Sequence, residues 1–385
     1  MDDQFKGLQC TIMRGGTSKG VFIMGSELPS DPEKRDKVIR AVFGSPDIRQ
    51  IDGLGGADVL TSKLAIIDPP SVEGSDVDYT FAQVGIDTDF IDYKGNCGNI
   101  SSAVGPFAID NGMVHAVEPV TTVRIHLTNS GKMLTAEVPV KDGKALSFGD
   151  YHIDGVPGTG ARIGMDWSDT VGAFTGKLLP TGNVTDIIIT DEGEYEVSLV
   201  DAGNPLVFIS AASLGLAGTE SPAVIESNRV LMSTIEKIRS EAAVVFGLVD
   251  SPEKAVSESP FNPFFAIISP PAAYIAINGE SVADSEIDLV SRLLFMQRMH
   301  KTYPITGTVC TAAASMIPGT IVNRLMRENA VNNPVLRIGH PGGVIDAEKK
   351  GRKENGEIIV EKISVGRTAR KIMEGVVYVS KAVID

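Results

Sequence analysis

The chain has 385 residues, enough for two domains of roughly 190 residues each, and 43% hydrophobic residues, a composition typical of folded soluble proteins. Its net charge of −14 is not offset by any basic stripe, which excludes a nucleic-acid-binding surface. The three cysteines and five histidines form no CxxC, HxH or HExxH pattern, so we expect no metal site.

The same composition favours a cytoplasmic protein. Three scattered cysteines cannot form a disulfide framework, and a reducing compartment is therefore the location we expect. The most apolar stretch, residues 264–277, is interrupted by Pro270 and Pro271 and is too short to cross a bilayer. We expect no membrane contact.

The first predicted elements are two strands, residues 8–13 and 21–23, joined by a glycine-rich loop, residues 14–20. The loop combines two cations, two hydroxyls and free backbone amides, which is more than a simple hairpin turn requires. It therefore predicts a carboxylate-binding loop, with a hairpin turn as the alternative. Its candidate donors are Arg14, Thr17, Ser18 and Lys19.

A helix over residues 31–43 and a second glycine loop, residues 53–58, precede a strand over residues 61–67 that carries Lys63. A lysine at the start of an otherwise apolar strand either points into a ligand cleft or extends into water. The sequence pattern leaves both readings open.

Small residues surround Cys97 and are followed by an Ile/Ala/Val run, which predicts a tight turn entering a helix, framed by strands near residues 79–84 and 122–127. Asn99 or Ser101 is a candidate cap, and the amides of Gly98 and Asn99 lie where an anion binds a helix N-terminus. The positive end of the helix dipole at this N-terminus also favours a Cys97 thiolate, which can serve as a base. The alternative is a small cysteine packed under a turn.

Residues 148–181 are rich in Gly, Pro and Asp and predict a connection between domains. Their Gly158-Thr159-Gly160-Ala161-Arg162-Ile163-Gly164 run places its third glycine one position too late for a dinucleotide fingerprint, and no clear strand and helix flank it. Nucleotide binding is therefore not expected.

The second half of the chain repeats the first. Strands over residues 186–189 and 194–201 lead to a glycine loop, and Leu231, Ile235, Ile238, Ala242 and Val245 recur at helical spacing as core positions. Strands near residues 264–268 and 274–277 and a helix near residues 288–299 are expected next.

The Cys97 element then recurs, because Thr306-Gly307-Thr308 opens another small-residue helix. Two such helices, one in each half, predict a pseudo-twofold with a ligand held between opposed helix N-termini. A dianion suits that geometry.

Taken together, these segments resemble the diaminopimelate epimerase fold. The resemblance is more specific to the branch that contains methylaconitate isomerases, oxalomesaconate tautomerases and methylitaconate Δ-isomerase. It implies an α+β fold with two similar domains, each a β-sheet wrapped around a central helix, over residues 1–184 and 185–385, with the active site in the cleft between them. The segments that carry it are residues 13–20, 53–63, 95–106, 155–160, 201–205, 306–307 and 339–343.

The chain departs from the epimerases in its second half, where Pro304-Ile305-Thr306-Gly307 replaces the second catalytic cysteine. An epimerase needs an acid and a base on opposite faces of one carbon, so racemisation by two thiols is not expected. Cys310 lies beyond the turn, on the helix itself, and is interpreted as a packing residue.

Within the branch, the segments with Ser18, Lys63 and Cys97 look closest to methylitaconate Δ-isomerase, and the resemblance implies that these three residues are catalytic. Cys97 and Lys63 are then candidate base and acid, in an order that the sequence leaves open. That family moves a proton across an allyl unit, between 2-methylene-3-methylsuccinate and 2,3-dimethylmaleate, without a metal or organic cofactor. Substrate-binding candidates, besides the loop donors, are Gly98, Asn99, Thr306, Gly307, Thr308 and His340.

The expected partner is a small unsaturated dicarboxylate, and we expect a homodimer or homotetramer. Methylaconitate isomerisation and oxalomesaconate tautomerisation are the alternative reactions. A non-catalytic dicarboxylate-binding protein would need the loops and helix termini but neither Lys63 nor Cys97. A cysteine-nucleophile hydrolase would need a histidine directed at Cys97, and no recognisable motif supplies one.

Overall fold

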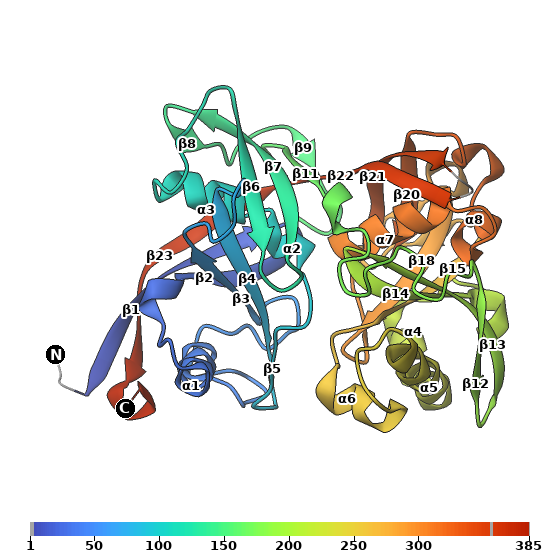
Figure 1. Cartoon of the computed structure of the whole chain (residues 1–385), viewed down its shortest axis with the longest axis horizontal. Helices are drawn as coiled ribbons and strands as arrows, with labels where there is room; N and C mark the ends of the chain where they lie inside the picture. The colour runs from blue at the N-terminus through green and yellow to red at the C-terminus, as the bar shows by residue number, and fades with distance from the viewer. Residues whose placement is uncertain (1–3, 355–356, 385) are drawn as a thin grey trace. The chain divides into compact units, whose positions relative to one another are not determined.

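The computed structural model describes residues 4–354 and 357–384, and the chain divides into two compact units (Figure 1). Unit 1 comprises residues 1–165 and 367–385, and unit 2 comprises residues 166–366. This division differs from the predicted boundary after residue 184. Residues 166–184 belong to unit 2, where Gly172 N donates to Asp201 O. The end of the chain returns to unit 1, where it pairs with the first strand.

Unit 1 is a mixed sheet with three principal helices. Its elements are β1 (Phe5–Gly15), β2 (Ser18–Met24), α1 (Pro32–Phe43), β3 (Lys63–Asp68), β4 (Val77–Val84), β5 (Ile91–Asp92), α2 (Gly98–Ser101), α3 (Val104–Asp110), β6 (Val120–Leu127), β7 (Lys132–Lys141), β8 (Lys144–Ala145), β9 (Tyr151–His152), β10 (Thr159–Gly160), β11 (Ile163–Asp166, at the division), β23 (Ala369–Ser380) and the terminal turn α9 (Lys381–Ile384).

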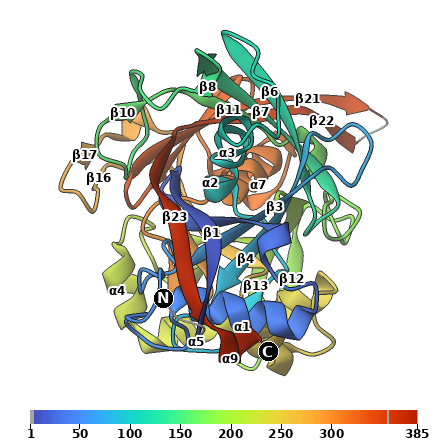
Figure 2. The same cartoon turned by 90° about the vertical axis from the view of Figure 1, so that its left-hand side faces the viewer.

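In unit 1, β1 and β2 form an antiparallel hairpin closed by Gly16 and Thr17. β2 runs parallel to β3, β3 antiparallel to β4, β4 parallel to β6, and β6 antiparallel to β7. β23 pairs with the whole length of β1, and Figure 2 shows the two strands side by side. The residues of α2 and nearly all of α3 are buried, as expected for a central helix covered by a sheet.

Unit 2 has a similar set of elements. They are β12 (Asp186–Thr190), β13 (Gly193–Ala202), β14 (Asn204–Ser210), α4 (Pro222–Ser227), α5 (Arg229–Val245), α6 (Ala255–Glu258), β15 (Phe264–Ser269), β16 (Tyr274–Ile275), β17 (Ser281–Val282), β18 (Leu289–Phe295), β19 (Arg298–Met299), α7 (Ile305–Met316), α8 (Ile321–Leu325), β20 (Val335–His340), β21 (Gly343–Glu354) and β22 (Glu357–Arg367, at the division).

The strand pairings of unit 2 repeat those of unit 1. β14 runs parallel to β15, β15 antiparallel to β18, β18 parallel to β20, and β20 antiparallel to β21. The helix α7 has the position in this order that α2 and α3 have in unit 1, and its residues from Ile305 to Ser315 are buried. The predicted internal repeat and the α+β fold class are confirmed.

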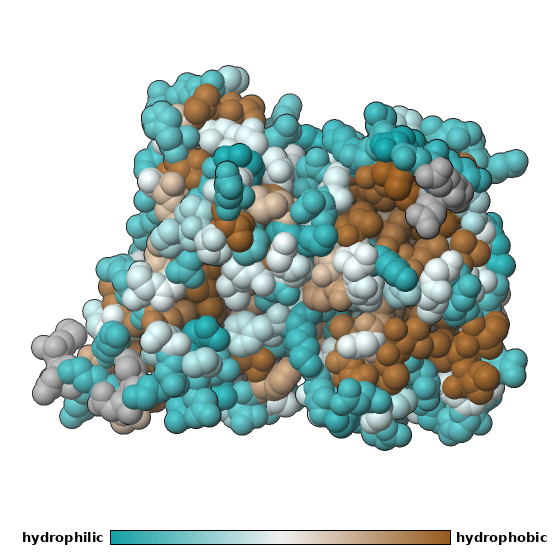
Figure 3. All heavy atoms as spheres, viewed as in Figure 1, coloured by the Kyte–Doolittle hydropathy of each residue, from teal (hydrophilic) through white to brown (hydrophobic). Residues whose placement is uncertain are grey.

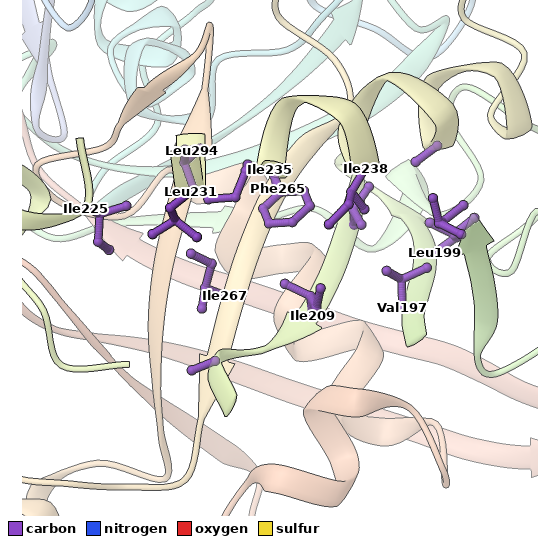
Figure 4. Close-up of a cluster of buried hydrophobic side chains, with 14 of the residues drawn as sticks. Val197, Leu199, Ile209, Ile225, Leu231, Ile235, Ile238, Phe265, Ile267 and Leu294 are labelled. Carbon is purple, nitrogen blue, oxygen red and sulfur yellow. The ribbon is translucent and has the colours of Figure 1, made fainter. Parts of the chain in front are cut away.

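The apolar face of α5 forms one core of unit 2, as Figure 4 shows. Leu231, Ile235, Ile238 and Ala242 are buried there against strands β13, β14 and β15, as the helical spacing predicts. Val245, the fifth predicted core residue, is 44% exposed. The helix ends at Val245, and the next residue, Phe246, packs into the core instead.

The predicted helix near residues 288–299 is wrong, because the structure forms strands β18 and β19 there. Every residue from Leu289 to Phe295 is buried. Because both faces of this strand are covered, its sequence, Leu-Val-Ser-Arg-Leu-Leu-Phe, lacks the alternation of apolar and polar residues that marks a half-exposed strand, and its periodicity does not distinguish it from a buried helix.

Strand β12 pairs with β13, and its middle residue Ile188 faces the core while Ile187 and Ile189 are exposed. Figure 3 shows hydrophobic side chains gathered on the visible face over β12 and β13. Among the described residues, no helix is long and apolar enough to cross a membrane.

Candidate active site

Lys63 is the first residue of β3 and is only 2% exposed, so the structure excludes the reading of a solvated lysine. The strand register places Gly20 of β2 on one side of Lys63 and Gln83 of β4 on the other. A turn directly before β3 is held by Asp58, whose Oδ1 accepts a hydrogen bond from Leu60 N. The lysine is therefore fixed inside the sheet at its backbone.

The side chain of Lys63 has three kinds of neighbour. Its Nζ donates to Gln83 Oε1 at 2.6 Å and lies 5.3 Å from the centre of the Phe81 ring. It is also close enough to the Cys97 side chain for Cys97 to favour the charged form of the amine. Burial lowers the pKa of Lys63 below its usual value, while Cys97 and then Asp58 oppose that shift. A lowered pKa makes the neutral amine, which can accept a proton, easier to form than in an exposed lysine.

Cys97 is the N-cap residue of α2 and is 7% exposed. Its carbonyl accepts hydrogen bonds from the backbone N and the Oγ of Ser101. The buried phenol of Tyr79 lies near the thiol, and burial together with the Cys97 charge raises the pKa of Tyr79 well above its usual value. Cys97 is therefore near both a buried lysine and a phenol that stays neutral.

The predicted capping of this helix by Asn99 or Ser101 is wrong. The N-cap position belongs to Cys97 and has no side-chain capping bond. Asn99 Oδ1 instead accepts from Thr17 N at 3.4 Å, which ties α2 to the glycine loop. The helix breaks after Ser101, where the Ser101 and Ser102 hydroxyls donate back to carbonyls of the same turn.

The glycine loop packs directly on α2. A Cβ on Gly15 would lie 2.5 Å from the carbonyl oxygen of Asn99, and one on Gly16, whose φ is +51°, would clash with the Asn99 side chain. This close approach explains both glycines. The loop is a two-residue hairpin turn, so the predicted alternative of a hairpin describes its backbone, while its contacts place it against Asn99 and Ile100 of α2.

Ser18 follows this turn at the start of β2, and its side chain is buried. Gly20 of β2 pairs with Lys63, and Ser18 lies two residues before Gly20, so the Ser18 side chain points to the same face of the sheet as Lys63. Ile100 of α2 covers that face at Gly20. Among the described residues, the Ser18 hydroxyl has no hydrogen-bond partner. A buried hydroxyl that makes no internal bond is available to a ligand.

The cations of the loop have different environments. Arg14 Nη1 donates to the carbonyls of Gly16 and Thr368, each at 2.9 Å, which fixes the turn against the start of β23. Burial and then the charge of Arg370 lower the pKa of Arg14. The Lys19 side chain is half-buried, and its backbone N donates to Leu60 O.

The remaining predicted binding residues belong to unit 2. Thr306, Gly307 and Thr308 form the first turn of α7 and not a loop before it, because the helix begins at Ile305. Asn204 Nδ2 donates to Thr306 Oγ1, and Thr308 Oγ1 donates to Pro304 O. The Thr308 hydroxyl is therefore already used within the helix.

His340 is buried in unit 2, at the end of β20. Its Nδ1 is 3.0 Å from the backbone N of Gly342, which donates to it, so a neutral His340 carries its proton on Nε2. The ring stacks on Tyr303 with centroids 6.3 Å apart. Of the predicted site residues, Ser18, Lys63, Cys97, Asn99 and the glycine loop belong to unit 1. The first turn of α7 and His340 belong to unit 2.

Cys310 is fully buried, and its Sγ donates to Val200 O. Burial raises its pKa well above the usual value, so the thiol stays protonated. These contacts agree with the packing role inferred for it. Among the described residues, no three His, Cys, Asp or Glu side chains form a group able to hold a metal ion.

Sequence reasoning missed Gln83 and Tyr79, which both lie on β4. A signal for Gln83 was present, because it is a polar residue within the apolar end of β4, between Ala82 and Val84. Its significance depends on the strand register, which places it opposite Lys63 and which no local pattern supplies.

Comparison with known proteins places this geometry in a family. Residues 5–380 match the family described as PrpF protein. The chain belongs to the PrpF protein family. It is 53% identical over 99% of both chains to the 3-methylitaconate isomerase of Eubacterium barkeri, and 38% identical over 96% of both chains to the 2-methyl-aconitate isomerase of Shewanella oneidensis.

Solved structures agree with this assignment to the PrpF family. A crystal structure of methylitaconate-delta-isomerase is 52% identical in sequence and has a TM-score of 0.81. The match covers 100% of this chain and 98% of the other. A hydroxyproline epimerase from Agrobacterium vitis shares the fold alone. It is 14% identical, with a TM-score of 0.57, and the match covers 98% of this chain and 93% of the other. The resemblance and the isomerase class inferred from the sequence are confirmed.

Proposed function

We propose that this PrpF family protein interconverts 3-methylitaconate, which is 2-methylene-3-methylsuccinate, and 2,3-dimethylmaleate. The observation that carries the proposal is the buried Lys63 amine, which interacts with the Cys97 side chain and lies on the sheet face that holds Ser18. The 53% identity to the Eubacterium barkeri isomerase over nearly the whole chain supports this choice of substrate.

The reaction breaks one C–H bond and forms another. A base removes the proton from C3, which bears a methyl group and a carboxylate, and leaves a dienolate delocalised over C3, C2 and the methylene carbon. An acid then protonates the methylene carbon, which becomes a methyl group as the double bond moves between C2 and C3. No electrons are gained or lost, so the reaction requires no redox partner.

Lys63 and Cys97 are the proposed acid and base. The lowered pKa of Lys63 favours a neutral amine that is able to take a proton, and the adjacent thiol can supply one. Each group contributes about 10²–10⁴-fold when its pKa is near the working pH. Which of the two removes the first proton stays open.

Charge on the carboxylate oxygens grows in the dienolate, and preorganised donors there are worth roughly 3–4 kcal/mol each. The Ser18 hydroxyl is the donor that its burial supports best. We further propose contributions to carboxylate binding from Thr17, Lys19 and the amides of Gly98 and Asn99. Arg14 would act by holding the loop, since its Nη1 donates to two carbonyls.

In unit 2, we propose the first turn of α7 and His340 as binding elements for the substrate. The amides of Thr306 and Gly307 precede the first bond of the helix, from Thr308 N to Pro304 O, which makes this end of α7 suitable for an anion. His340, with its Nδ1 occupied by Gly342, would donate from Nε2.

Cis-trans isomerisation of 2-methylaconitate is the second candidate reaction, supported by the 38% identity to the Shewanella oneidensis isomerase. Tautomerisation of 4-oxalomesaconate is a third. Both are proton transfers next to carboxylates and would use the same pair of groups. We also propose that the protein works in the cytoplasm as a homodimer or homotetramer.

The test is to offer the purified protein each unsaturated acid separately and to identify products by ¹H NMR. We expect 3-methylitaconate to be converted to 2,3-dimethylmaleate with the highest kcat/KM. Preferred turnover of 2-methylaconitate or 4-oxalomesaconate would reassign the substrate, and absence of turnover with all three acids would refute the proposal.

A further inference from the structure

Gln83 lies directly opposite Lys63 in the register of β3 and β4, and only 1% of it is exposed. Its Oε1 accepts a hydrogen bond of 2.6 Å from Lys63 Nζ. A buried amide at this position adds nothing to an apolar core, so its hydrogen bonds must account for its presence.

Those bonds fix the orientation of the amide. Gln83 Nε2 donates to the carbonyls of Ser62 at 3.0 Å and Val59 at 3.2 Å. Both acceptors are backbone oxygens, so the NH₂ end must face them and the carbonyl end must face Lys63. A carbonyl oxygen only accepts, and Lys63 therefore has to present an N–H to it in either protonation state.

The anchor of Gln83 is itself held in place. The Ser62 hydroxyl donates to Val84 O and accepts from Gln50 Nε2, and the Gln50 Oε1 accepts from Ala57 N. These bonds tie the loop before β3 to Val84 of β4 and to the segment that carries Gln50. Gln83 thus connects a rigid backbone to the lysine amine.

We propose that Gln83 is a positioning residue that directs the Lys63 amine toward Cys97 and sets the pH range in which Lys63 is charged. The inference rests on the proposed role of Lys63 in proton transfer. Gln83 acts through Lys63 and is not itself placed against the substrate. A misplacement of about 1 Å in a catalytic group can cost about 10²-fold in rate.

The other groups that face Lys63 are Cys97 and Asp58, which favour its charged form, and the Phe81 ring. The Tyr79 phenol lies beside Cys97 and stays neutral. A substitution at Gln83 leaves the identity of these residues unchanged, so a shift in the titration of Lys63 would report on the loss or replacement of the amide.

Two variants shift that titration in opposite directions. Gln83→Met removes the acceptor, which disfavours the ammonium and lowers the pKa of Lys63. Gln83→Glu keeps an acceptor and adds a negative charge, which raises it. We expect each shift to be about one pH unit. A residue that only filled space would produce neither.

The measurement is a pH titration followed by ¹³C NMR, with the whole protein carrying lysine labelled at Cε. The Lys63 signal is identified as the one missing from the spectrum of Lys63→Arg. It needs no substrate. We also expect Gln83→Met to lower kcat by about 10- to 100-fold with a smaller change in KM.

Asn129→Leu is the matched control. Asn129 also bonds β4 through its amide, accepting from Phe81 N and donating to Phe81 O and Tyr93 O, yet it does not contact Lys63. We expect it to lower thermal stability without shifting the Lys63 titration.

A Lys63 titration that both Gln83 variants leave at the wild-type pH would overturn the inference, as would an equal shift in Asn129→Leu. If Gln83→Met does not fold, the upward shift in Gln83→Glu decides alone. If the wild type converts none of the acids, the proposed function fails, while the titration still decides the role of Gln83.

Discussion

The side chains of Lys63 and Cys97 interact inside unit 1, although one begins β3 and the other precedes α2. Both are buried, and the lysine is held by its bond to Gln83. Two groups able to exchange a proton in a site shielded from water are suited to moving a proton along a substrate.

Cys97→Ser should lose about 10²-fold or more in kcat while the protein keeps its fold. A hydroxyl is nearly the same size as a thiol but is far too weak an acid to ionise near neutral pH. The measurement is kcat with 3-methylitaconate beside the thermal midpoint of unfolding. Cys10→Ser, at another buried cysteine of unit 1, is the control and should keep its turnover. Near-normal kcat in Cys97→Ser would assign this cysteine to packing.

Ser18→Ala should separate activity from stability. The buried Ser18 hydroxyl makes no bond to the described residues, so its removal should change the free energy of unfolding by less than about 0.5 kcal/mol. Activity should fall by about 10²-fold in kcat/KM, because a donor to the developing charge is lost.

Ser198→Ala provides the opposite control. The Ser198 hydroxyl donates to Val184 O and accepts from Ile321 N, both inside unit 2. Its loss should destabilise the protein by about 1–3 kcal/mol and leave kcat unchanged. A marked loss of stability in Ser18→Ala with full activity would show that the Ser18 hydroxyl is structural.

Lys349 should make stability depend on pH. Its buried Nζ donates to Ala330 O, and burial lowers its pKa from 10.5 to about 8. Between these two values the unfolded chain binds more protons than the folded one, so the free energy of unfolding rises with pH in this window. Denaturant unfolding at pH 7.5 and pH 10 should show this rise relative to Lys349→Met. Equal pH dependence in both proteins would contradict the assignment.

Catalysis should not require a metal or an organic cofactor, because the proposed steps use only proton transfer between side chains and substrate. Activity should survive exhaustive chelation followed by desalting. Loss of activity that an added divalent metal or nicotinamide cofactor restores would contradict this prediction.

Local patterns in the sequence were enough to predict the two strands that flank the first glycine loop, the helix over residues 31–43 and the paired architecture of the two halves. They failed where tertiary contacts override periodicity. Residues 289–295 form a strand because both faces are covered, and Val245 is exposed because the helix ends there. Local patterns also could not predict the environment of Lys63, because it depends on the register of β3 and β4, which places Gln83 opposite Lys63.

For the site, residue types left functional and structural readings of Lys63 and Cys97 open, and the family resemblance implied that Ser18, Lys63 and Cys97 are catalytic; the structure groups the three in one unit. What the sequence left open was the choice between a buried and a solvated lysine. That choice is determined by how β2, β4 and α2 enclose β3, which involves residues far apart in the chain.

Substitution of Lys63 tests the account most sharply, because a binding role and a proton-transfer role have different kinetic effects. Lys63→Ala should lower kcat by about 10²-fold or more, whereas loss of a purely attractive charge would mainly raise KM. Lys63→Arg keeps the charge but cannot release a proton near neutral pH, so it should remain impaired.

The most direct measurement is chemical rescue of Lys63→Ala, with turnover of 3-methylitaconate followed by ¹H NMR in the presence of added amines. Ethylamine, which fits the space left by the lysine side chain and can transfer a proton, should restore kcat in a saturable manner. Tetramethylammonium, which supplies only charge, should not. Near-wild-type kcat in Lys63→Ala without any amine, or equal rescue by both cations, would contradict a proton-transfer role for Lys63.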